Sequence, residues 1–83
     1  MDDETKLEIQ KLNHAVDRFS RCMKAKLKAK AIMSYGGWND PNMGQGMKES
    51  LLLHSARVYA GEKRQCVDVA NLAMFLFFLE GKS

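Results

Sequence analysis

The first third of the chain carries apolar residues at steps of three and four positions. These residues are Ile9, Leu12, Val16, Phe19, Met23 and Leu27. This spacing predicts a single apolar stripe along a helix of about 25 to 30 residues, roughly 40 Å long. We expect the helix to begin near Asp2 or Asp3, because a carboxylate suits the positive end of the helix dipole.

A turn-rich stretch interrupts the pattern, beginning at Tyr35 and reading Tyr-Gly-Gly-Trp-Asn-Asp-Pro-Asn-Met-Gly. Glycines, asparagines and the sole proline cluster here, so the first helix is expected to end before it. The stretch also holds the only tryptophan, Trp38. We favour Trp38 as a hydrophobic plug that pins the connection onto the core, and the alternative is a stacking surface for a planar ligand.

Two further helices follow the break. Met47, Leu51, His54 and Val58 recur at helical spacing and indicate a helix over about residues 45–59. It is followed by Gly61, which suits the left-handed position after a helix C-terminus.

The third helix is predicted over about residues 63–79, where glycine and proline are absent. It is apolar on nearly every side after residue 66, and such a helix has to be surrounded. Three helices from one short chain cannot enclose it, so we expect a second copy of the protein to be contacted by Phe75, Phe77, Phe78 or Leu79. The predicted fold is therefore all-α, a single domain over 1–83 forming a three-helix bundle that oligomerisation completes.

Composition places the chain among globular, soluble proteins, with 46% apolar and 28% charged residues. The longest apolar run falls well short of the roughly 20 residues that a membrane-spanning helix needs, so no membrane association is expected. The acidic N-terminus does not have the pattern of a signal peptide, which indicates the cytoplasm. Cys22 and Cys66 lack metal-ligand spacing and are expected to be small buried side chains.

Positive charge is concentrated in one part of the first helix, although the net charge is only +3. Six basic residues lie between Arg18 and Lys30, with no acid until Asp40. The run is either a solvated helix face or a surface for phosphates, nucleic acid or an acidic partner. Direct nucleic-acid binding is not favoured, because no aromatic residues are interleaved with the bases.

Three polar residues interrupt the apolar third helix: Gln65, Asp68 and Asn71. Their spacing of three places them on one face of the helix. Such a strip is either the margin where the helix meets water, or one wall of a polar cavity that binds a cation or a hydrogen-bonding ligand.

The order of several short motifs resembles a known family. Met23-x-x-Lys-Leu27 is followed by Gly36-Gly-Trp-Asn-Asp40 and then by Cys66-Val-Asp-Val-Ala-Asn-Leu-Ala-Met74. Over about residues 19–76 this order is similar to small phage-encoded relatives of the MazG-like all-α nucleotide pyrophosphohydrolases. The resemblance implies an oligomeric helical bundle that hydrolyses nucleoside triphosphates to monophosphate and pyrophosphate. It also implies Mg²⁺ held by a Glu-x-x-Glu and a Glu-x-x-Asp pair.

The chain departs from this acidic pattern. Asp68 matches the aspartate, but Gln65 stands where its glutamate would be, and the preceding helix offers Glu49 alone. The metal candidates are thus Glu49 and Asp68, with Mg²⁺ expected only if the chain is an active enzyme. His54 and Asp68 are a further candidate pair for general-base catalysis.

We therefore predict a protein of MazG-like descent, phage- or prophage-derived, that acts by binding a nucleotide or a host protein, without catalysis and without a cofactor. The alternative is an active Mg²⁺-dependent pyrophosphohydrolase. The candidate ligand-binding residues are Lys26, Lys30, Trp38, Arg57, Asp68 and Asn71, in which the basic side chains would hold phosphates in place of a metal.

Overall fold

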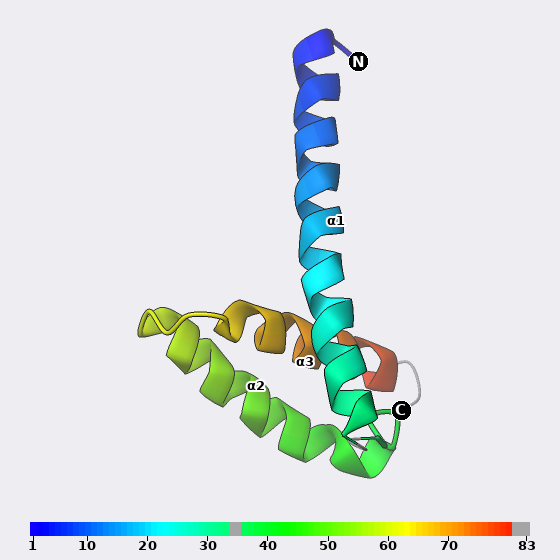
Figure 1. Ribbon diagram of the computed structural model, residues 1–83, viewed down its shortest axis with the longest axis vertical. Helices are drawn as coiled ribbons and strands as arrows, with labels where there is room; N and C mark the ends of the chain where they lie inside the picture. Colours follow the sequence, from blue (N-terminus) through cyan, green and yellow to red (C-terminus); the bar gives the residue numbers. More distant parts are fainter. Residues whose placement is uncertain (34–35, 81–83) are drawn as a thin grey trace.

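The computed structural model describes residues 1–33 and 36–80, and over those residues it is helical with no β-strand (Figure 1). The elements, in chain order, are α1 (Asp3–Ile32), the 3-10 turn η1 (Pro41–Met43), α2 (Gly44–Tyr59) and α3 (Gln65–Glu80). The prediction of an all-α chain with a long first helix and two shorter ones is confirmed. No helix in the described ranges is both long and apolar enough to cross a membrane.

α1 begins at Asp3, one of the two acidic residues where the sequence predicted its start. Asp2 is the N-cap, and its Oδ1 accepts a hydrogen bond of 2.7 Å from the backbone N–H of Thr5. Asp3 and Glu4 follow in the first turn, and Lys30 lies in the last turn, so charge complements the helix dipole at both ends. This hydrogen bond holds the pKa of the Asp2 carboxyl below its usual value.

The connection to α2 uses the residues of the predicted break. Gly37 has a φ of 82°, a left-handed conformation that glycine adopts without strain. Asp40 then caps η1 through a hydrogen bond from the Asn42 N–H, with Pro41 in the first turn. Tyr35, where the break was expected to begin, lies outside the described residues.

A tight turn joins α2 to α3, and the two helices pack against each other as a hairpin. Gly61 adopts the predicted left-handed conformation, with a φ of 85°, and its N–H donates to the Val58 carbonyl. Arg64 also has a positive φ, 70°, which ordinary residues seldom adopt. This second left-handed residue delays α3 to Gln65, two residues later than the sequence pattern indicated.

α1 crosses α3 with its C-terminal half, and its N-terminal half projects away from the hairpin (Figure 1). The radius of gyration is 15.4 Å, whereas a compact chain of this length would have about 12 Å. Among the described residues only Met47 and Leu79 are buried apolar side chains. The isolated chain is thus an open L shape with a very small core.

The cysteines and the apolar side chains of α3 differ in how far the chain covers them. Cys22 and Cys66 are exposed, so the prediction that they are buried is wrong. Both lie on sides of their helices that the rest of the chain leaves uncovered. α3 is covered on one side, where Leu79 is buried and Phe75 is half-buried, whereas Phe77 is 67% exposed and Phe78 is also exposed.

We predict that Asp2→Ala will increase amide hydrogen exchange at Thr5, because it removes the acceptor of that N–H. Asn is an equally good N-cap, so Asp2→Asn is the matched control and should retain the protection. Folding lowers the pKa of the Asp2 carboxyl, so the ionised carboxylate stabilises the folded protein. This stabilisation is complete above the usual aspartate pKa and is lost as the pH falls through the lower folded-state pKa. Asp2→Asn should lose this pH dependence. Equal exchange at Thr5 in all three proteins would contradict the capping role.

Candidate functional site

The polar strip on α3 points into the molecule. Asp68 is 7% exposed and Asn71 is 4% exposed, which makes them more buried than any apolar residue of the described chain. Of the two interpretations of this strip, the water margin is therefore excluded for Asp68 and Asn71. Burying a carboxylate and a carboxamide is costly unless partners satisfy them, so their surroundings define the site.

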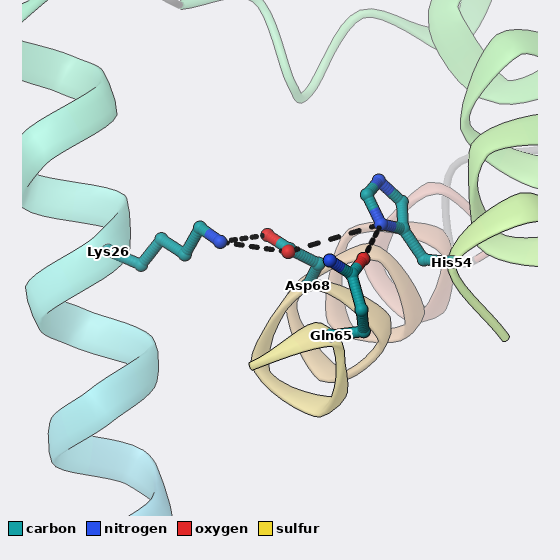
Figure 2. A network of polar contacts seen from close by, with 4 residues as sticks. All are labelled: Lys26, His54, Gln65 and Asp68. Atoms are coloured by element: carbon teal, nitrogen blue, oxygen red, sulfur yellow. Dashed lines mark hydrogen bonds and ion pairs between the residues drawn. The ribbon is translucent and has the colours of Figure 1, made fainter. Parts of the chain in front are cut away.

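Lys26 of α1 supplies the partner of Asp68. Its Nζ lies 2.7 Å from Oδ1 and 2.8 Å from Oδ2 of the carboxylate (Figure 2). Lys26 stands on the side of α1 that meets α3, next to the half-buried Leu27. The charge of Asp68 is thus neutralised within the chain. Lys26 was expected to hold phosphates, but this contact directs its ammonium group to Asp68.

His54 of α2 completes a network across the three helices. Its Nδ1 lies 2.6 Å from Oε1 of Gln65 and 3.9 Å from Oδ2 of Asp68 (Figure 2). Because the amide oxygen of Gln65 is an acceptor, Nδ1 is the donor and carries a proton. The distance to Asp68 is too long for a hydrogen bond. Gln65, and not Asp68, therefore orients the imidazole, which weakens His54 and Asp68 as a catalytic couple.

A cavity of about 120 Å³ opens beside this network. It is lined by Leu27 and Lys30 from α1, Ser50 and His54 from α2, and Asp68, Asn71, Leu72 and Phe75 from α3. The Oδ1 atom of Asn71 is buried without a hydrogen-bond partner within the described part of the chain. Leaving such an acceptor unsatisfied costs roughly 1–3 kcal/mol. A hydrogen-bond donor that reached Oδ1 of Asn71 would therefore be stabilising.

A larger apolar groove of about 1030 Å³ adjoins the polar cavity, and the two share Leu27, Lys30 and Phe75. The groove is lined by Trp38 and by four methionines, Met33, Met43, Met47 and Met74. The Trp38 ring stacks on Phe75, with centroids 5.3 Å apart, and meets Phe78 edge to face. Trp38 thus joins the connection to α3, as the plug interpretation requires, but it is 40% exposed, and it also lines the groove.

The remaining candidates lie apart from the network. Glu49 is exposed and accepts a hydrogen bond of 3.4 Å from Gln45, and Arg57 lines neither the cavity nor the groove. Five residues separate Glu49 from His54, which is about 140° around a helix, so the two side chains diverge. Residues 1–33 and 36–80 contain no group of three His, Cys, Asp or Glu side chains that would hold a metal.

Sequence reasoning missed Ser50 as a cavity residue and the pairings of Lys26 with Asp68 and of His54 with Gln65. A usable signal was present for the first pairing. Lys26 follows Met23 by three residues and so continues the apolar stripe of α1. A lysine on such a stripe indicates a buried acidic partner, because a charge is seldom buried unpaired.

Comparison with known protein families, with curated proteins and with solved structures finds no match to this chain. The MazG-like resemblance therefore stays a hypothesis carried by the sequence motifs alone.

We predict that Lys26→Met will lower the free energy of unfolding by about 1–3 kcal/mol, because it leaves the buried Asp68 carboxylate without its cation. Lys24→Met is the matched control: Lys24 is exposed on the same helix, and its loss should cost no more than about 0.5 kcal/mol. Adding Asp68→Asn to Lys26→Met should recover part of the loss, because no unpaired charge remains. Strictly additive effects in urea unfolding would show that the two side chains do not interact.

Proposed function

We propose that this protein binds a nucleotide without turning it over, in the polar cavity and the groove beside it. The unpartnered Oδ1 of Asn71 carries the proposal, since Asn71 lines a cavity whose other polar groups come from all three helices. A ligand amino group that donates to this oxygen would satisfy it. Binding would then offset the cost of burying this oxygen without a hydrogen bond.

The shape of the two spaces supports a nucleotide. The groove is near the upper end of the range of about 300–1,000 Å³ typical of small-molecule sites. Trp38 and Phe75 supply aromatic surface for a base. Lys30 lines both spaces and offers a cation for a phosphate oxygen, and the other bases of α1 add a positive field around it.

The arrangement of Asp68 supports binding over hydrolysis. Mg²⁺ requires near-octahedral oxygen ligation, with carboxylates as its protein ligands. Asp68 is the one acid in the network, and its two oxygens contact Lys26. The neighbouring Gln65 contacts His54. This donor set fits Mg²⁺ poorly, so no reaction step is assigned to a metal here.

The proposal includes MazG-like descent, a phage or prophage origin and action in the host cytoplasm, all of which rest on the sequence motifs. The second candidate is a scaffold that blocks a host protein, which the many exposed apolar side chains favour. A panel of nucleotides distinguishes the two functions.

We expect at least one common nucleotide to raise the melting temperature of the protein in a thermal-shift assay. At a concentration of 100 Kd the gain in the free energy of unfolding is about 2.7 kcal/mol. A panel without any shift would reject nucleotide binding and favour the host-protein function. Repeated release of pyrophosphate with Mg²⁺, abolished by Asp68→Ala, would reject the non-catalytic assignment and support the pyrophosphohydrolase.

We predict that Asn71→Leu will have opposite effects on stability and on binding. The substitution replaces the orphan carboxamide by an apolar group of similar size, so the free protein should become more stable, by about 1–3 kcal/mol at most. The thermal shift caused by the nucleotide should disappear. Asn42→Ala, at an exposed position in η1, is the control that should change neither quantity. An Asn71→Leu protein that is less stable and still binds would refute the role given to Oδ1.

A further inference from the structure

The N-terminal half of α1 has an apolar face that no other part of the described chain covers. Leu12 is 56% exposed and Val16 is 62% exposed, and both continue the stripe that Met23 and Leu27 extend to the contact with α3. One continuous stripe is therefore packed at its C-terminal end and bare at its N-terminal end. Figure 1 shows the bare half projecting beyond the hairpin of α2 and α3.

The accessible surface of the chain is larger than that of a compact monomer of the same mass, as expected if a partner covers part of it. The accessible surface is 6850 Å², whereas a folded monomer of 9.4 kDa has about 5,000 Å². A standard interface buries about 800 Å² per partner, and obligate interfaces bury more. The excess is thus large enough for a stable dimer.

The distribution of charge along α1 indicates that a second copy of this chain is a suitable partner. Residues 1–17 contain five acids and two lysines, a net charge of −3, and residues 18–33 contain six bases and no acid. Parallel pairing of two such helices would place like charges together, and antiparallel pairing places the acidic half of each beside the basic half of the other. A second copy of this chain therefore complements the charge of α1 and offers apolar surface to its exposed stripe.

We propose that two copies pair antiparallel through α1, so that the N-terminal half of each α1 packs on the other chain. It would lie on the partner's hairpin, alongside the basic half of the partner's α1, and close one side of the apolar groove that contains Trp38 and Met47, leaving the rest of the groove open to a ligand. Each groove then lies among four helices, three from one chain and one from its partner, an arrangement typical of four-helix bundles. The pairing does not depend on any ligand, so it stands or fails separately from the proposed function.

Sedimentation of two leucine variants tests the use of the stripe. Leu7 and Leu12 are similarly exposed, at 51% and 56%, but they lie about 140° apart around α1, with Leu7 off the stripe. The wild-type protein should sediment as a dimer at micromolar concentration. Leu12→Glu should raise the dimer dissociation constant about tenfold or more, and Leu7→Glu should leave it unchanged. A monomeric wild type, or equal effects of the two substitutions, would overturn the proposal.

Carbodiimide cross-linking tests the direction of pairing without any substitution. Glu8 lies at the edge of the stripe and Lys30 lies on it, about 33 Å apart along the axis of the same helix, too far to be joined within one chain. Antiparallel pairing should therefore yield Glu8–Lys30 cross-links only between chains, in a product of twice the chain mass. A dimeric product that joins acidic residues to Lys6 or Lys11 of the other chain, without links to Lys28 or Lys30, would overturn the antiparallel arrangement.

Charge reversal gives an independent readout if Leu12→Glu fails to fold. Glu4→Lys with Glu8→Lys leaves three acids and four lysines in residues 1–17, a net charge of +1, and Lys28→Glu with Lys30→Glu leaves four bases and two acids in residues 18–33, a net charge of +2. Each double variant alone should dimerise more weakly than the wild type, because positions 4 and 8 of one chain then carry the same charge as positions 28 and 30 of the other. An equimolar mixture should form a heterodimer in which both contacts are attractive. Failure of the mixture to associate better than either variant would contradict the charge complementarity.

Discussion

The ion pair between Lys26 and Asp68 is the contact on which the arrangement of the site depends. It joins the long first helix to the hairpin at a point where very little apolar surface is buried. The same contact neutralises the one carboxylate of the polar network, and it sets the crossing of α1 beside the cavity. Desolvation of this buried carboxylate offsets much of its attraction to the ammonium group, so the net contribution of the pair to stability is smaller than the attraction alone.

The cavity follows from that crossing. With α1 held at Asp68, Lys30 reaches the space between α2 and α3, and Asn71, whose buried oxygen is unsatisfied, also lines it. The adjoining groove has soft methionine walls, which adapt to the shape of what they contact. The continuous space has a hydrogen-bonding end and an apolar end. We therefore propose a nucleotide as its ligand, and not a bare metal ion.

The helices were predictable because each depends on local patterns: the stripe of α1, the Asp2 cap, and the left-handed Gly61. The site was predictable only in part. Asp68 and Asn71 could be identified as anomalies on an apolar helix, and the place of Lys26 on the stripe of α1 indicates an acidic partner, but no local pattern identifies that partner as Asp68, 42 residues away. The start of α3 was placed too early, because the positive φ of Arg64 has no signal in residue type, unlike that of a glycine.

The sequence by itself therefore determined the three helices, the caps and turns between them, and the segregation of charge along α1. Those features depend on neighbours within a few positions, where hydrogen bonding and periodicity act. The tertiary structure decided which way the polar strip faces, which base neutralises Asp68, and that the cysteines are exposed. These outcomes depend on the crossing of α1 over α3, which brings together residues far apart in the chain and which no local periodicity specifies.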